Sequence, residues 1–128
     1  MANGQEDQAQ KQISNIFLRA AASSLKAKNY AAAVEDALKV NEFGENAQAY
    51  QIAAQASQMQ KKNADAISYF EKYLELAPNA KNATQIAFTL GALYQQAGNK
   101  VKAIEFYLQA VTDPKFGAEA LKQINALK

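Results

Sequence analysis

A short sequence pattern recurs three times along the chain, and this recurrence restricts the fold more than any other feature. Each copy holds an alanine followed by a β-branched residue, at Ala33, Ala66 and Ala103. These alanines are 33 and then 37 residues apart. Self-similarity with a period of about 20 to 50 residues is typical of stacked supersecondary units. The sequence therefore predicts a repeat protein.

The spacing of apolar residues within each copy predicts two helices. In the third copy an i, i+4, i+7, i+8 stripe follows the turn at Gly98 and Asn99, and it comprises Ala103, Tyr107, Ala110 and Val111. An i, i+3, i+4, i+7 stripe precedes each turn, formed by Phe17, Ala20, Ala21 and Ser24, by Tyr50, Ala53, Ala54 and Ser57, and by Ala87, Leu90, Gly91 and Tyr94. Both spacings place apolar residues on one face of a helix. We therefore expect pairs of antiparallel helices, with Gly98 ending one helix in the left-handed conformation and Asn99 capping the next.

These helix pairs resemble the tetratricopeptide repeat family. The third copy is the most similar, at Leu90, Gly91, Tyr94, Gly98, Asn99, Ala103, Ile104, Tyr107 and Ala110, with Pro114 one residue early. The resemblance implies an all-α fold, an α-α superhelical solenoid of three tetratricopeptide-like helix-turn-helix repeats with a C-terminal capping helix. We expect seven helices of about 13 to 18 residues.

The expected organisation is a polar N-terminal segment followed by one domain. Residues 1–12 form the polar lead-in, and residues 13–128 form a single domain. Its parts are repeats at about 14–46, 47–83 and 84–115 and a capping helix at 117–127. The capping helix is predicted from the stripe formed by Ala120, Leu121, Ile124 and Leu127.

The residue inventory argues against a β fold and against an enzyme. The chain has 28 Ala but only 14 Val, Ile and Thr together, whereas β-sandwiches and barrels are rich in β-branched residues. It has no His and no Cys, so the common zinc ligands, a thiol nucleophile and an imidazole acid–base group are all missing. Glu35 and Asp36 are adjacent on a helix and point about 100° apart, so they do not share a site. We expect no catalytic residues, no metal and no cofactor.

Charge and hydropathy exclude two classes of partner. The net charge is +2, and the only basic doublet, Lys61-Lys62, falls in a predicted turn, so we expect no nucleic-acid binding. No segment approaches the roughly 20 apolar residues of a membrane span, so we expect no membrane insertion. Residues 1–12 lack the apolar segment of a signal peptide. Both a cytoplasmic location and export after removal of a leader stay open.

The resemblance implies that the first helix of each pair lines a concave face. The residues expected there are Leu18, Arg19, Ala22, Gln48, Gln51, Ile52, Gln55, Gln85, Phe88, Thr89, Ala92 and Gln95. Amide side chains both donate and accept hydrogen bonds, so this Gln-rich face suits the backbone of an extended peptide. Leu18, Ile52 and Phe88 either form an apolar strip along the face or are partly covered by neighbouring helices or by the N-terminal lead-in.

Some members of this family bind the acidic C-terminal tail of a chaperone through a carboxylate clamp of Lys, Asn and Arg. The matching positions here are Leu18, Ala22, Ile52, Gln85 and Thr89, and none carries the required residue type. We therefore expect a non-enzymatic protein–protein interaction module that binds a peptide or helix but not a chaperone tail. The alternative is a self-associating assembly module of a larger complex. It would form a homodimer through the segment from Phe17 to Leu25 or through the last helix.

Overall fold

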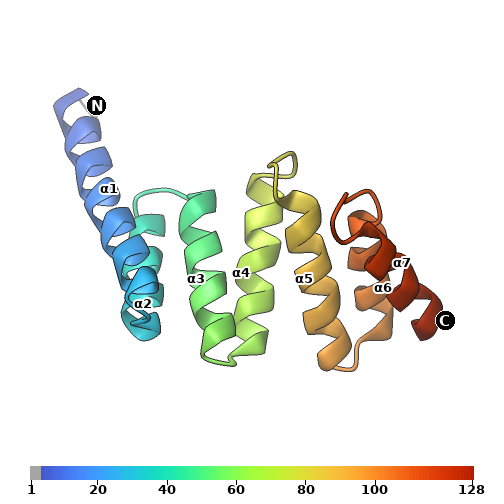
Figure 1. Cartoon of the computed structure of the whole chain (residues 1–128). Helices are drawn as coiled ribbons and strands as arrows, with labels where there is room; N and C mark the ends of the chain where they lie inside the picture. Colours follow the sequence, from blue (N-terminus) through green and yellow to red (C-terminus); the bar gives the residue numbers. More distant parts are fainter. Residues whose placement is uncertain (1–3) are drawn as a thin grey trace. The chain divides into compact units, whose positions relative to one another are not determined.

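The computed structural model describes residues 4–128, and this part of the chain folds into seven α-helices without strands (Figure 1). In chain order they are α1 (Gly4–Lys26), α2 (Tyr30–Asn41), α3 (Ala47–Met59), α4 (Asn63–Leu76), α5 (Ala83–Gln96), α6 (Lys100–Ala110) and α7 (Gly117–Leu127). The chain divides into two compact units, residues 1–73 and 74–128, so each unit is described by itself. None of the helices in residues 4–128 is both long and apolar enough to cross a bilayer.

Three tight turns between helices share one backbone geometry. Lys28, Lys61 and Gly98 have φ angles of 65°, 62° and 81°, in the left-handed region. After each helix the next amide reaches back to a carbonyl five residues earlier, as in the 2.9 Å bond from Asn99 N to Tyr94 O. This is the Schellman arrangement that ends a helix. The three turns are again 33 and 37 residues apart, which confirms the register of the repeat in the backbone.

The first unit is held together by small residues at the contacts between α1, α2 and α3. Its core contains Ala21 from α1, Ala33, Ala37 and Val40 from α2, and Ala49, Ile52, Ala53 and Ala56 from α3. Phe17, Leu18, Leu25, Tyr30, Val34 and Tyr69 pack around this core. Alanine at facing positions lets helix axes approach closely, so the high Ala content is explained by packing as well as by helix propensity.

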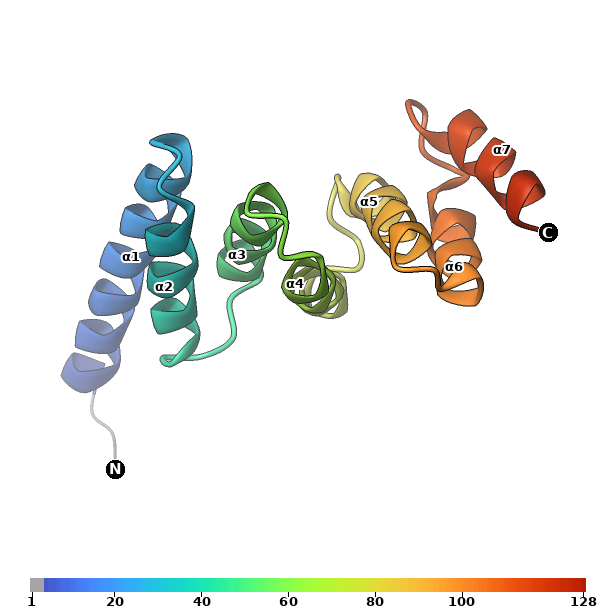
Figure 2. The same ribbon diagram turned by 90° about the horizontal axis from the view of Figure 1, so that it is seen from below.

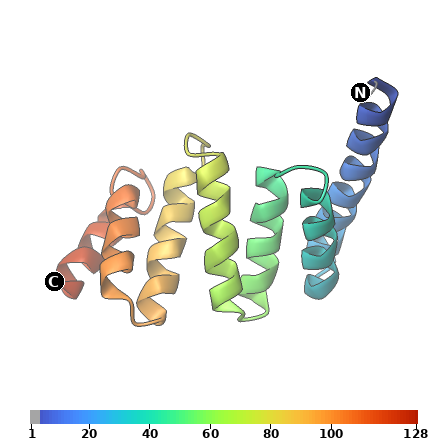
Figure 3. The same ribbon diagram turned by 180° about the vertical axis from the view of Figure 1, so that it is seen from behind.

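The core of the second unit combines small residues with a buried aromatic side chain, Tyr107. Its core contains Ala87 from α5, Ala103, Tyr107 and Ala110 from α6, and Ala120 and Ile124 from α7. α7 has the bounds expected for the capping helix. Figures 2 and 3 show α5 and α6 as an antiparallel pair with α7 beyond α6.

Asp113 fixes the loop between α6 and α7. Its carboxylate accepts hydrogen bonds from the Thr84 hydroxyl at 2.7 Å and from the backbone amides of Lys115 and Phe116 at 2.8 and 2.7 Å. These hydrogen bonds lower the pKa of the Asp113 carboxyl, with the Thr84 bond as the largest cause. The loop is thereby tied to the first turn of α5.

α1 begins earlier than the sequence pattern indicates. Residues 4–12 of the expected lead-in are helical, and residues 1–3 lie outside the described part of the chain. Glu6 and Asp7 occupy the first turn, where negative charge favours the helix dipole, and the remaining residues are mostly good helix formers. The result is a helix of 23 residues, while the other six have 11 to 14. The expected length of about 13 to 18 residues is therefore wrong for α1, which is longer, and for α2, α6 and α7, which are shorter.

Candidate functional site

The predicted site residues of the first unit come from α1 and α3, and most of them reach solvent. Arg19, Ala22 and Gln48 are exposed, whereas Gln51 and Gln55 are half-buried. The three glutamines are spaced i, i+3, i+7, so α3 carries them along one face. α3 of the first unit therefore carries an amide-rich face that is partly exposed to solvent.

Two of the three apolar residues predicted to form a strip are in this unit, and both contribute to packing. Ile52 is only 6% exposed and belongs to the core of the unit, and Leu18 is half-buried against the same core. Ile52 is buried because it packs in the core that α3 shares with α1 and α2. The exposed apolar side chain on this part of α3 is Met59, which is 59% exposed and follows Gln55 by one helical turn.

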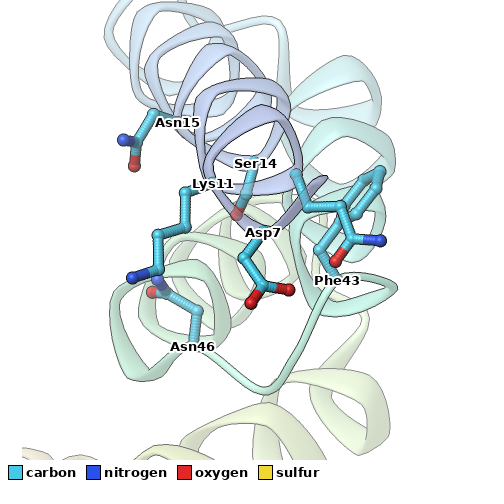
Figure 4. Close-up of a pocket in the computed structure, with 7 residues that line it drawn as sticks. Asp7, Lys11, Ser14, Asn15, Phe43 and Asn46 are labelled. Atoms are coloured by element: carbon cyan, nitrogen blue, oxygen red, sulfur yellow. The ribbon is translucent and has the colours of Figure 1, made fainter. Parts of the chain in front are cut away.

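A pocket of about 450 Å³ lies at the N-terminal part of α1 in the first unit (Figure 4). Its lining residues come from α1 and from the loop between α2 and α3, and they are Asp7, Gln10, Lys11, Ser14, Asn15, Phe43 and Asn46. All of them except Phe43 are polar, so the pocket offers both donors and acceptors. The sequence pattern does not indicate this pocket, because it predicts a polar lead-in rather than a helix over residues 1–12. The acidic residues Glu6 and Asp7 are the sequence signal that could have indicated the earlier start of α1.

Asn46 holds the floor of this pocket in place. Its side-chain oxygen accepts a 3.0 Å hydrogen bond from the amide of Ala49 and caps α3. Its own backbone amide donates to Asn41 Oδ1 at 2.8 Å. The side-chain nitrogen of Asn41, Nδ2, is buried and makes no hydrogen bond within the described residues.

The predicted site residues of the second unit all come from α5, and two of them, Phe88 and Gln95, contact α6, α7 or the loop between these helices. Gln85 is exposed, whereas Phe88, Thr89, Ala92 and Gln95 are half-buried. The Phe88 ring stacks on Phe116 with centroids 5.0 Å apart and meets the edge of Tyr107 at 5.4 Å. Phe88 is therefore partly covered, which is the second of the two alternatives raised by the sequence.

Gln95 takes part in a chain of hydrogen bonds inside the second unit. The Tyr107 hydroxyl donates to Gln95 Oε1 at 2.7 Å, and Gln95 Nε2 donates to Gln123 at 3.4 Å. Gln123 in turn donates to Glu119 at 2.9 Å. Burial, and secondarily the negative charge of Glu119, raises the pKa of Tyr107. Gln95 thus connects α5 with α6 and α7.

Three glutamates in the described part of the chain form exposed ion pairs with lysines. Glu35 pairs with Lys39 at 3.8 Å, Glu45 with Lys72 at 3.8 Å and Glu105 with Lys102 at 3.5 Å, all with substantial side-chain exposure. Within residues 4–128 no group of three or more His, Cys, Asp or Glu side chains is placed to hold a metal ion.

The packing of paired helices in a repeating register defines a helical-repeat protein. The sequence matches no protein-family profile and no curated protein. Solved structures are nonetheless similar over most of the chain. Two crystal structures of MamA each have a TM-score of 0.73 at 20% identity and align with 95% of this chain and 74% and 69% of theirs.

The tetratricopeptide TPR2AB domain of yeast Sti1, solved as a complex with pHSP90, is similar as well. It has a TM-score of 0.66 at 19% identity, and the match covers 91% of this chain and 46% of that one. The chain therefore has the tetratricopeptide repeat fold, as the sequence resemblance predicted.

Proposed function

We propose that this chain is a non-enzymatic protein–protein interaction module that binds a peptide or helix along α3 of its first unit. The observation that carries the proposal is the row of Gln48, Gln51, Gln55 and Met59 along one face of α3. Three amides and one exposed thioether supply hydrogen bonds for a backbone and an apolar contact for a side chain.

α1 supplies the second edge of this binding face. Arg19 and Ala22 are exposed on α1, and Lys11 and Asn15 line the pocket nearer its N-terminus. Arg19 brings a planar donor group that suits a backbone carbonyl or a carboxylate. A peptide bound here would therefore meet amides on α3 and cationic or amide donors on α1.

The proposed partner is not the acidic tail of a chaperone. The five positions that match the carboxylate clamp hold Leu18, Ala22, Ile52, Gln85 and Thr89. Ile52 is buried and Leu18 is half-buried, so neither position presents a polar group to a carboxylate. Two carboxylates of a peptide terminus would lack charge-assisted hydrogen bonds at these positions.

A peptide-library selection on the intact chain tests this proposal. The selected peptide is titrated by calorimetry into the wild type and into the Gln51→Ala and Gln55→Ala variants. Gln109→Ala, at an exposed residue of α6, is the matched control. We expect the two α3 variants to weaken binding at least about tenfold and the control to leave it unchanged. Equal affinities for all four proteins would overturn the proposal.

Self-association is the second candidate function. The observation that favours it is the exposed apolar surface of α1 at Ile13 and Ile16, which is distinct from the α3 row. In that case the chain would act as an assembly module, and its partner would include a second copy of itself.

A further inference from the structure

Helix α1 presents apolar side chains at positions that are buried in later helices. The repeat register relates Ile16 to Ala49 of α3 and Ile86 of α5, and relates Ala20 to Ala53 and Leu90. All four counterparts are buried. In α1, by contrast, Ile16 is 62% exposed. A position that is covered in the other first helices is thus open in α1.

The open surface continues along α1 beyond Ile16. Ile13 is 41% exposed, Ala9 is exposed and Ala20 is half-buried. Figure 1 shows that the N-terminal half of α1 extends past the end of α2. A second pocket, of about 280 Å³, lies on this side of α1 and is lined by Gln12, Asn15, Ile16 and Arg19. This face, made of Ala9, Ile13, Ile16 and Ala20, is called the α1 seam below.

The spacing of the α1 seam is the one that pairs helices. Its members are separated by four, three and four residues, which is the a/d spacing of a coiled coil. The two isoleucines lie at the centre, and an alanine stands at each end. Large apolar groups at the centre supply burial, and alanines at the ends permit close approach of the helix axes.

We propose that the α1 seam binds the α1 seam of a second copy of this chain in an antiparallel pair. In this arrangement Ile13 lies beside Ile16 of the second copy, and Ala9 lies beside Ala20 of the second copy. The two contacts repeat across a two-fold axis, so one surface is its own complement, as an isologous dimer requires.

Charge selects the antiparallel orientation. The first turn of α1 carries Glu6 and Asp7, and its last turn carries Lys26. Antiparallel pairing places each acidic turn near the basic turn of the second copy and opposes the two helix dipoles. Parallel pairing would bring the acidic turns together. A helix of 23 residues is about 34 Å long, so these ends are separate sites of attraction.

The corresponding last helix of the chain is less suited to the same role. On α7, the residues beside the exposed Leu121 include Lys122 and Asn125, which are both exposed. α7 therefore has a single large apolar side chain that is strongly exposed, and not a pair like Ile13 and Ile16 on α1. Leu121, at 54% exposure, therefore serves as a control of similar exposure to Ile16.

Sedimentation velocity over a concentration series from about 1 μM to about 1 mM tests the proposal without any peptide present. We expect the wild type and Leu121→Glu to form dimers with equal affinity. Ile16→Glu should raise the dimer dissociation constant at least about tenfold, with unchanged helicity because the side chain is exposed. If Ile16→Glu does not fold, Ile13→Lys serves the same purpose. A wild type that stays monomeric, or seam variants that dimerise as tightly as the wild type, would overturn the proposal.

The orientation has its own test, because the chain contains no cysteine. Ile13→Cys and Ile16→Cys proteins are mixed and oxidised. Antiparallel pairing predicts that disulfides form mainly between residue 13 of one protein and residue 16 of the other. Disulfides mainly between identical positions would contradict it. Neither measurement involves the α3 row, so failure here leaves the peptide-binding proposal standing, and the reverse also holds.

Discussion

The ring of Tyr107 on α6 lies directly against Gly91 on α5. A Cβ atom built on Gly91 would be 2.7 Å from Tyr107 Cδ1, closer than real Cβ contacts allow. The ring has little room to move, because it is 2% exposed and its hydroxyl is hydrogen-bonded to Gln95. The two helices of the third pair therefore owe their close approach to the missing side chain at residue 91.

Gly91→Ala should destabilise the protein despite the higher helix propensity of alanine. We expect a loss of about 1 to 3 kcal/mol in the free energy of unfolding, because the new methyl group forces the helices apart. Urea denaturation measures this loss. Gly4→Ala is the control, since no atom lies within 4 Å of a Cβ there. A Gly91→Ala protein as stable as the wild type would show that Tyr107 adjusts freely.

Shortening Tyr107 should relieve the strain caused by alanine at residue 91. The first helix pair already holds alanine at both equivalent positions, Ala21 and Ala37. In a double-mutant cycle, the loss for Gly91→Ala combined with Tyr107→Ala should therefore be smaller than the sum of the two single losses. Strictly additive losses would mean that the two residues do not interact.

Two lysines adopt a backbone conformation that favours glycine. Lys28 and Lys61 have positive φ angles, at positions where the third pair has Gly98. A residue with a Cβ is disfavoured by about 1 kcal/mol in this conformation. Lys28→Gly and Lys61→Gly should each raise the thermal midpoint, whereas Gly98→Ala should lower it. Thermal unfolding followed by circular dichroism checks both directions, and a lower midpoint for both lysine variants would contradict the assignment.

The hydrogen bonds to Asp113 make part of the stability depend on pH. Because its folded pKa is lowered from the ordinary value of 3.8, the ionised form favours the folded state. This stabilisation is present above that ordinary value and is lost as the pH falls through the lower, folded pKa. Asp113→Ala should therefore lower the thermal midpoint at pH 7, and the difference from the wild type should shrink in strongly acidic solution. A difference that does not change with pH would exclude this linkage.

An acidic C-terminal peptide should not bind through the clamp positions. Fluorescence anisotropy with a peptide ending in aspartate, compared with a scrambled amidated peptide, should give no preference for the free acidic terminus. The expected reason is the lack of paired cationic donors at Leu18, Ala22, Ile52, Gln85 and Thr89. A clear preference that is lost on Arg19→Ala would instead place a carboxylate site on α1.

Most of the fold could be predicted because the chain repeats itself. Ala33, Ala66 and Ala103 set a register that the backbone reproduces at Lys28, Lys61 and Gly98. Apolar spacing also located the capping helix. The start of α1 was harder to predict, because a polar helix has no apolar periodicity to mark it.

For the candidate site, the sequence predicts which helices carry its residues but not which of their side chains reach solvent. Gln48, Gln51 and Gln55 lie on one face of α3 as expected, because helical spacing decides which residues share a face. Whether Ile52 or Phe88 reaches solvent depends on neighbouring helices. Phe116, for example, covers Phe88 from 28 residues away in the sequence.

Peptide binding along α3 is the central claim, and amide chemical-shift mapping tests it most directly. A library-selected peptide is titrated into the isotopically labelled chain, and the perturbed amides are assigned. We predict that the largest shifts in the first unit occur at Gln48, Gln51 and Gln55. Shifts confined to the exposed side of α2, at Ala31, Glu35 and Leu38, would contradict the account.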